Sequence, residues 1–399
     1  MLALEANPSA ACVLGAIPAR LAFLVFLFLI TALCAEFPQY GGWDVAAYMA
    51  IVRTDHSHGA VYDELRRSLP AAYYAELVGK SKSPFLGTHP GDVGDEYRRD
   101  MASNPTHFAQ QLPLYRVKWL YLLLIWTLWK LGAGLYSATH LISLVTFFGS
   151  GLIVWRWLSL HMSEWAAAIV AVTTISQPGL VQAARSALPD ALSIFLLISG
   201  SYFLWERNNY YHLGSMLLLL SVASRPDNLV FCLLALAASR KWVACLGAWA
   251  ISLSILHFSG FAASWGWSKT FCHGFVHQLY APAESVVHIT PAVYISAVSF
   301  SAVNLLLHSG FLIFAMLGVW SLLGGKKESR VPIAVCLGTM FLHYLIFPDE
   351  TDRFFVAQYI MILTILASSY VSVASRLLAV EHVIAGATSS QTKFFPQDA

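Results

Sequence analysis

Residues 17–35 read IPARLAFLVFLFLITALCA, an apolar run long enough to cross the hydrocarbon core of a bilayer as one helix. The chain then changes character, because residues 36–115 are polar and hold ten of the 22 acidic residues. This change predicts a first membrane span followed by a large extramembrane loop. Since nearly half of the acids lie in that one loop, we expect the function to reside there.

The composition is that of a protein whose main solvent is lipid. Hydrophobic residues make up 57% of the 399 and charged residues only 12%, with a mean hydropathy of +0.62. A soluble domain carries about 25% charged residues. The net charge of +2 is too small to indicate a nucleic-acid partner. We therefore expect an all-α integral membrane protein.

Further apolar runs predict nine more spans, each of about 20 residues or fewer where neighbouring helices bury it. They lie at 136–157, 165–183, 190–205, 211–223, 228–239, 242–260, 300–323, 331–347 and 355–375. Residues 113–132 (PLYRVKWLYLLLIWTLWKLG) are short and rich in Trp and Tyr, which favours an interfacial helix over a span. The chain is then one transmembrane domain over 1–399 with ten spans. Its first extracytoplasmic loop, 36–132, carries interfacial helices.

Basic residues set the predicted orientation. With the N-terminus in the cytoplasm, the cytoplasmic side holds Arg20, Arg156, Arg207, Arg240, Lys241, Lys326, Lys327, Arg330, Arg376 and Lys393. The short outer loops hold Arg185, Arg225, Lys269 and Arg353. This asymmetry follows the positive-inside rule. Proline blocks both glycosylation motifs, at Asn7 and Asn104, which favours a bacterial inner membrane protein with its active site on the periplasmic face.

Asp44 is the first candidate for chemistry, in the segment GGWDVAAYMAIV (41–52) that follows the first span. Tyr48 lies four residues later, so the two side chains would share one face of a short helix. A carboxylate under a capping loop at the membrane surface is suited to act as a general base. The alternative is a helix-capping aspartate on a wet surface.

Three arginines form the second candidate, because each lies at an outer span end near an acid. Arg185 precedes Asp190, Arg225 precedes Asp227, and Arg353 follows Asp352. Guanidinium groups suit phosphate through their planar fork of donors, so three at one face favour a lipid-phosphate site. The alternative is a set of Arg–carboxylate pairs that hold the span ends together.

Other polar residues of the outer loops carry weaker signals. Lys269 and His273 are candidates for the acceptor site or for loop packing. Residues 91–100 (GDVGDEYRRD) have carboxylates but lack the spacing of a calcium-binding loop. We therefore predict no metal ligands, and a divalent cation is an alternative that we do not favour.

Four local features together resemble the GT-C class of polytopic glycosyltransferases, which use polyprenyl-phosphate sugars and include protein mannosyltransferases and aminoarabinose transferases. They are the Asp44–Tyr48 element, the interfacial helix that ends in Leu-Gly at 131–132, the Pro-Asp-Ala segment at 189–191, and the motifs SRPD (224–227) and DRFF (352–355). Their order covers residues 15–375. Each motif is short, and the resemblance rests on their joint order.

The resemblance implies a GT-C-like fold with the catalytic acid in the first outer loop, at Asp44. Many members of that class have a second acid at the next position, where this chain has Val45. A single base is then expected. Members that transfer oligosaccharides usually have a large soluble C-terminal domain, and this sequence ends at residue 399 soon after its last predicted span, so a monosaccharide donor is expected. The partners would be a polyprenyl-phosphate-linked sugar, membrane lipid, and an acceptor hydroxyl on a glycan, lipid or protein.

The expected mechanism is a direct displacement at the anomeric carbon, with inversion. Asp44 would take the acceptor proton, while Arg225 and Arg353, with Arg185 in reserve, would neutralise the phosphate leaving group. The alternatives are a non-catalytic lipid or solute transporter, or an accessory subunit of a system that assembles envelope glycans. A transporter predicts polar residues at mid-span and internal repeats, whereas these spans are nearly free of charged residues and show no convincing repeat.

Overall fold

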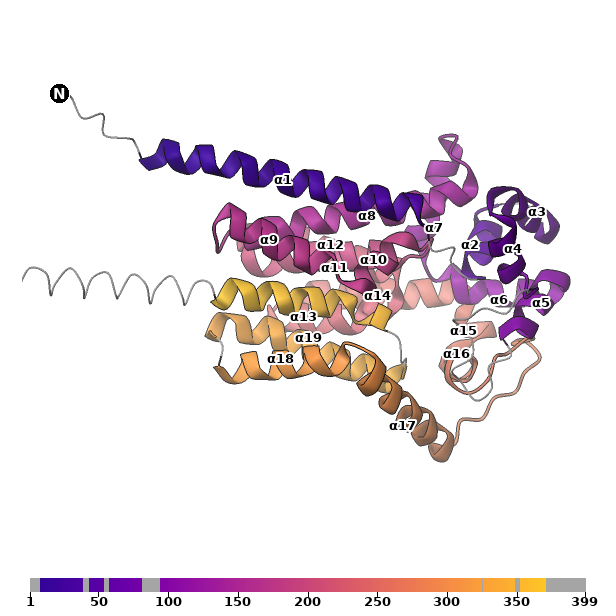
Figure 1. Ribbon diagram of the computed structural model, residues 1–399. Helices are drawn as coiled ribbons and strands as arrows, with labels where there is room; N and C mark the ends of the chain where they lie inside the picture. Colours follow the sequence, from indigo (N-terminus) through magenta and orange to yellow (C-terminus); the bar gives the residue numbers. More distant parts are fainter. Residues whose placement is uncertain are drawn as a thin grey trace, which may run out of the picture.

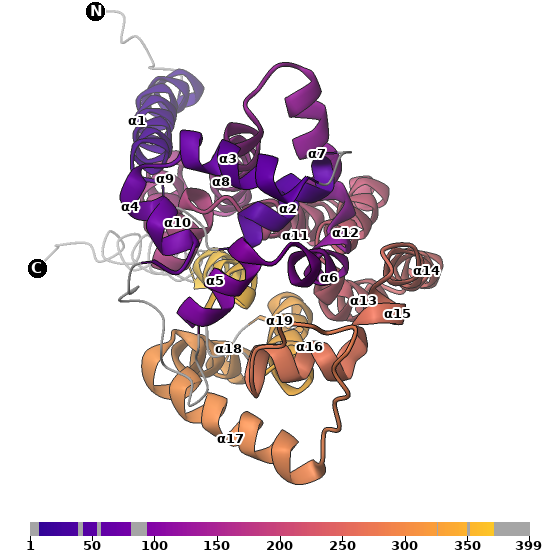
Figure 2. The ribbon, with the colours of Figure 1, turned by 90° about the vertical axis from the view of Figure 1, so that its right-hand side faces the viewer.

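The computed structural model describes residues 8–38, 43–53, 57–80, 94–324, 326–348 and 352–370. All regular structure within these residues is helical, which confirms the predicted all-α class (Figure 1). Long apolar helices form a bundle. Shorter helices form an outer layer over one end of that bundle, at the right of Figure 1 and facing the viewer in Figure 2.

The bundle helices run back and forth between the two ends of the molecule (Figure 1). They are α1 (Pro8–Glu36), α8 (Leu135–Leu158), α9 (Glu164–Ile175), α10 (Pro178–Arg185), α11 (Asp190–Ser201), α12 (Tyr211–Ser224), α13 (Leu229–Ala238), α14 (Trp242–Phe258), α18 (Phe311–Gly324), α19 (Lys327–Ile346) and the helix Val356–Tyr370. Because consecutive helices run in opposite directions, every second loop that joins them lies beneath the outer layer.

The outer layer comes mainly from the predicted first loop. Its helices are α2 (Asp44–Val52), α3 (His58–Ser68), α4 (Ala71–Leu77), α5 (Gly94–Ser103), α6 (Pro105–Arg116), α7 (Trp119–Lys130), α15 (Phe261–Ser264), α16 (Gly266–Phe275) and α17 (Pro291–His308). Three of them have clear start signals, because Ser57 caps α3, Asn104 caps α6 and Thr290 caps α17 through their side-chain oxygens.

Three described helices are by themselves long and apolar enough to cross a membrane: α1 from Ile17, α8 and α19. The bent pairs α9–α10 and α17–α18 raise the number to five if each pair is one span. The other apolar helices have 10–17 residues, so by length and composition the described residues supply three to five candidate spans where ten were predicted. These helices are compatible with membrane embedding.

Two predicted spans are broken. The run 165–183 bends by 67° between α9 and α10, where Pro178 begins a new helix because it cannot donate to the preceding turn. The run 300–323 was predicted as one helix, but the helices α17 and α18 meet at 79°. Ser309 separates them with an extended backbone, and its hydroxyl accepts a hydrogen bond from the amide of Phe311 at 3.1 Å.

The predicted interfacial helix at 113–132 is also two helices. Here α6 ends at Arg116 and α7 begins at Trp119, while Lys118 has φ −98° and ψ 57°, outside the helical region. The run 190–205 likewise changes form, since α11 ends at Ser201 and a π-helical turn follows over Tyr202–Glu206.

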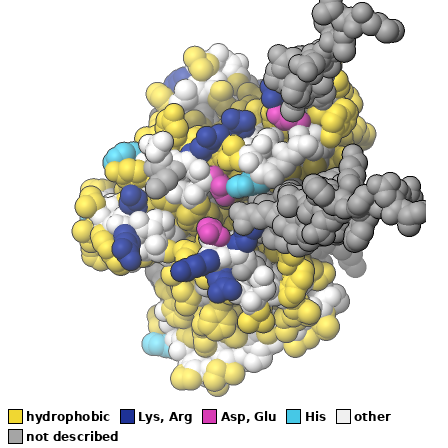
Figure 3. Space-filling model, turned by 90° about the vertical axis from the view of Figure 1, so that its left-hand side faces the viewer, with side chains coloured by type: hydrophobic (Ala, Val, Ile, Leu, Met, Phe, Trp, Pro, Cys, Tyr) yellow, Lys and Arg dark blue, Asp and Glu magenta, His cyan; other side chains and the backbone are white. Residues whose placement is uncertain are grey.

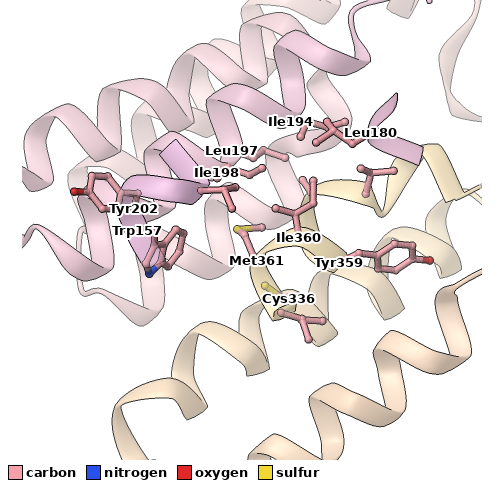
Figure 4. Close-up of a cluster of buried hydrophobic side chains, with 14 of the residues drawn as sticks. Trp157, Leu180, Ile194, Leu197, Ile198, Tyr202, Cys336, Tyr359, Ile360 and Met361 are labelled. Atoms are coloured by element: carbon pink, nitrogen blue, oxygen red, sulfur yellow. The ribbon is translucent and has the colours of Figure 1, made fainter. Parts of the chain in front are cut away.

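The bundle core centres on α11, whose residues are almost all buried (Figure 4). Ile194, Leu197 and Ile198 belong to the same buried cluster as Ile360 and Met361 of the last helix. Lipid is as apolar as leucine, so helices in a membrane associate through close packing, which small residues allow. Such contacts hold α11 at the centre.

Small residues allow α11 and α12 to approach each other closely. A Cβ placed on Gly214 would lie 2.8 Å from the carbonyl oxygen of Gly200. The outer layer has a separate core of its own, in which Trp43, Tyr48 and Tyr121 are buried. The two cores make the outer layer a rigid cover for the ends of α8 and α11.

The other end of the bundle, shown in Figure 3, carries scattered Lys and Arg side chains among apolar ones. Helix termini place them there: Arg156 in the last turn of α8, Arg240 after α13, and Lys326 and Arg330 at the start of α19. These are among the residues predicted to face the cytoplasm. The basic end therefore lies opposite the outer layer.

Candidate functional site

A cavity of about 440 Å³ lies where the outer layer meets the ends of the bundle helices, and we call it the junction cavity. Its charged walls come from α2, the α6–α7 connection, the start of α11, the 3-10 turns Pro226–Asn228 (η3) and Asp352–Phe354 (η4), and the end of α19. Seven residues predicted from the sequence line it: Asp44, Tyr48, Asp190, Arg225, Asp227, His273 and Arg353.

Asp44 is the first residue of α2 and is half-buried against the cavity. Its Oδ1 accepts a hydrogen bond from the hydroxyl of Tyr115 at 3.0 Å. Trp43 holds the start of this helix, because its ring is buried and makes edge contacts with Phe108 and Tyr115. The carboxylate therefore lies at the wall of a cavity, and the alternative of a cap on a wet surface is wrong.

Tyr48 lies one helical turn after Asp44, as the spacing predicted, but it is 1% exposed and packs against Tyr115 and Tyr121. Burial, with the charge of Asp44, raises the pKa of the Tyr48 phenol well above its usual range. The phenol therefore remains neutral and forms part of the wall. The hydrogen-bond partner of the carboxylate is Tyr115, 71 residues away in sequence.

Lys118 is a cavity cation that the sequence analysis missed, because it was assigned to the membrane interface. Its Nζ lies 4.8 Å from the ring centre of Tyr115 and 5.4 Å from that of Tyr48. Such contacts hold an ammonium group over the faces of aromatic rings. Burial lowers the pKa of Lys118 to about 8, against the opposing effect of Asp44. At neutral pH the side chain therefore presents a positive charge beside the candidate base.

Arg225 is a buried charge of the cavity, with 8% exposure. Pro226 follows it, which ends α12 and holds the backbone of Arg225 extended. The guanidinium pairs with Asp190 and also with both oxygens of Asp227, at 2.8 and 3.2 Å. The predicted alternative of an Arg–carboxylate pair that joins span ends therefore describes this arginine.

His343 completes this charged cluster and was not predicted. It is 5% exposed at the end of α19, and its Nε2 lies 3.4 Å from Oδ2 of Asp227. The sequence does hold a signal, because His343 is the basic side chain within the predicted span 331–347. A polar group within a span is a functional candidate.

Arg353 is exposed at the cavity mouth, with its guanidinium carbon 4.8 Å from the ring centre of Phe354. The guanidinium carbon of Arg225 lies 4.6 Å from the centre of the same ring, so Phe354 contacts both guanidinium groups. Among the described side chains no carboxylate pairs with Arg353. The side chain of Asp352 lies outside the described residues.

Two predicted residues lie away from the cavity. Arg185 donates from its Nε to the carbonyl oxygen of Phe37 at 2.5 Å and so ties α10 to the end of α1. The Nζ of Lys269 donates to the carbonyl oxygens of Ser264 and Pro282, at 3.1 and 2.5 Å. Both are engaged with backbone groups, and neither lines the cavity with Asp44.

His273 lines the cavity from α16 and accepts a hydrogen bond at Nδ1 from the amide of Leu279 at 2.9 Å. Its ring makes edge contacts with Trp265 and Tyr97. Burial lowers the pKa of His273 to about 4. The imidazole is therefore neutral at physiological pH, and it joins the loop after α16 to the outer layer.

No cluster of three or more His, Cys, Asp or Glu side chains suited to a metal ion occurs within the described residues. Part of the acidic segment 91–100 lies outside them. In its described part, Asp100 accepts from His107 Nδ1 at 2.7 Å, which joins α5 to α6.

No protein-family model, curated protein or solved structure matches this chain.

Proposed function

We propose that this protein is a membrane glycosyltransferase of GT-C type. It would move a monosaccharide from a polyprenyl-phosphate donor to a hydroxyl of a glycan, lipid or protein on the extracytoplasmic face. We include in the proposal that the short apolar helices also cross the bilayer, which makes ten spans. The outer layer then lies in the periplasm of a bacterial inner membrane.

The observation that carries the proposal is the composition of the junction cavity. A half-buried carboxylate, Asp44, shares one cavity with the cations Lys118 and Arg353, at the level where bundle helices meet the outer layer. A lipid-linked sugar phosphate has its reacting carbon at this kind of boundary, because the tail lies in the membrane and the sugar outside it. The cavity therefore holds a candidate base together with candidate anion-binding groups.

The geometry favours Lys118 and Arg353 over Arg225 as the groups that meet the phosphate. Arg225 already pairs with Asp190 and Asp227, so its donors are directed at carboxylates. Lys118 contacts aromatic faces, and within the described residues no hydrogen bond or ion pair engages its ammonium group, which carries three N–H donors. Arg225 would then support the cavity wall and add a more distant positive charge.

The proposed reaction is a single displacement. Asp44 accepts the proton of the acceptor hydroxyl as that oxygen forms a bond to the anomeric carbon. The bond between this carbon and the phosphate oxygen breaks, and the electron pair leaves with the polyprenyl phosphate. Lys118 and Arg353 stabilise the charge that develops there, worth about 3 kcal/mol for one well-placed donor. A displacement from the opposite face inverts the anomeric centre.

The proposal is tested by transfer in proteoliposomes with a panel of radiolabelled polyprenyl-phosphate sugars and an extract of envelope glycans and lipids. One donor is expected to lose its sugar to the extract in the presence of wild-type protein, and to remain intact when protein is omitted. The product should have the opposite anomeric configuration, as read by glycosidases specific for each anomer. If every donor remains intact, the transporter or accessory-subunit alternative replaces the proposal.

A further inference from the structure

Tyr115 contacts both the candidate base and the candidate phosphate-binding cation of the cavity. Its hydroxyl donates to Oδ1 of Asp44, and its ring face lies under the ammonium group of Lys118. The side chain is 6% exposed, and its ring makes edge contacts with Trp43 and Tyr48 at 5.1 and 5.5 Å. One rigid ring therefore joins the candidate base to the candidate phosphate-binding cation.

We propose that Tyr115 is the positioning residue of Asp44, holding Oδ1 by a hydrogen bond so that Oδ2 is left to take the acceptor proton. This inference rests on the proposed transferase activity. It assigns no contact between Tyr115 and the substrate. The phenol acts through the carboxylate, whose rotation and basicity it sets.

The hydrogen bond from Tyr115 determines in which direction loss of its hydroxyl changes the basicity of Asp44. A donor to an ionised carboxylate stabilises the charged form and weakens it as a base. A hydrogen bond to a charged group is worth about 1.5 kcal/mol, close to one unit on the pH scale. Burial and the nearby Asp44 charge raise the pKa of the Tyr115 phenol well above its usual range, so it remains a donor across the working range of pH.

Other titratable groups near Asp44 must be held constant in a test of this kind. They come from several elements and comprise Tyr48, Tyr97, Lys118, Tyr121, Arg225, His273 and Arg353, together with the acids that pair with Arg225. Replacement of Tyr115 by phenylalanine leaves them in place. It also retains the ring beneath Lys118 and the edge contacts with Trp43.

The test compares the pH profile of kcat/KM for wild type, Tyr115→Phe and Tyr121→Phe, with the donor that wild type turns over. Tyr121 is a matched control, since it is buried, contacts Tyr48, and donates to the carbonyl oxygen of Thr139 at 3.4 Å. Tyr115→Phe is expected to lose about tenfold in kcat with little change in donor KM. The acidic limb of its pH profile should move to higher pH by about one unit. Tyr121→Phe should keep the wild-type limb.

A second measurement does not depend on turnover. Modification of Asp44 by a water-soluble carbodiimide, followed by mass spectrometry across pH, reports the protonation of its carboxyl group in each variant. The midpoint should rise in Tyr115→Phe and stay in place in Tyr121→Phe. An unchanged midpoint in a folded Tyr115→Phe variant overturns the inference, whether or not it is active. A shifted midpoint in a chain that transfers no sugar supports the contact and overturns the proposed function alone.

Discussion

The guanidinium of Arg225 binds the carboxylate of Asp227 through two nitrogens, at 2.8 and 3.2 Å, inside the junction cavity. A bidentate pair of this kind fixes both groups in one plane. Because Arg225 also pairs with Asp190 at the start of α11, one side chain joins the outer ends of two bundle helices. This makes Arg225 a structural centre of the cavity and shifts the proposed anion-binding role to its neighbours.

Replacement of Arg225 should therefore reduce stability more than replacement of Arg353. Arg225→Ala leaves Asp190 and Asp227 without their shared counter-charge in an enclosed site, which typically costs about 3–5 kcal/mol. Arg353→Ala removes an exposed side chain at the same cavity and should leave the melting temperature in detergent within about 2 °C of wild type. Equal melting temperatures for the two variants would refute the structural role of Arg225.

Affinity for the donor should fall as the pH rises through about 8, because Lys118 then loses its charge. A phosphodiester keeps its negative charge over the same range, so the change reports the protein. Lys118→Arg retains the charge and should give affinity that is flat from pH 7 to 9. Lys118→Met should be weak at every pH, by about tenfold at pH 7. Calorimetric titration with a short-chain form of the polyprenyl-phosphate sugar that wild type turns over measures all three. If donor affinity depends on pH in the same way for wild type and Lys118→Arg, Lys118 is excluded from the phosphate site.

Acid should destabilise the protein through His273. The pKa of this imidazole is lowered to about 4 from 6.5, so the folded state favours the neutral ring and its acceptor Nδ1. The stabilisation is then complete above pH 6.5 and is lost as pH falls toward 4, by about 2 kcal/mol. Melting temperatures across this interval should drop less in His273→Gln than in wild type. His288→Gln, at an exposed histidine, should show the wild-type decline.

The packing of α11 on α12 should not tolerate a methyl group at Gly214. Its Cβ would lie 2.8 Å from backbone atoms of the facing helix segment, at Gly200 and Leu204, and backbone cannot move aside as a side chain can. Gly214→Ala should cost about 1–3 kcal/mol. Gly247→Ala on α14 is the control, because its nearest neighbour is Leu219 at 3.9 Å. Equal melting temperatures would mean that the two helices lie farther apart.

Much of the helical architecture follows from local sequence. Apolar runs predicted where the bundle helices lie, and acids and bases at alternate helix ends predicted that Asp190, Arg225 and Asp227 would gather on one face. The breaks also had local signals that were overlooked. Pro178 interrupts one apolar run, and Ser309 followed by Gly310 interrupts another. A prediction based on apolar stretches as long as a span averages over such residues and does not detect the breaks.

The parts of the site that were missed depend on tertiary structure. Tyr115 meets Asp44 only because α6 packs against α2, and nothing in the spacing of 71 residues predicts this contact. Lys118 reaches the cavity because the helix breaks at that residue, whereas a continuous interfacial helix would have placed it at the membrane surface. Arg185 was predicted to share a site with Asp44, but its side chain bonds to the end of α1 instead.

The central claim is that Asp44 is the base of a glycosyl transfer, and sugar transfer by Asp44→Asn in proteoliposomes tests it most directly. The variant is isosteric, so it should bind the donor lipid as tightly as wild type and transfer its sugar at least about a hundredfold more slowly. Asp63→Asn, at an exposed carboxylate of α3 in the same outer layer, should retain the wild-type rate. Wild-type transfer by Asp44→Asn would contradict the account.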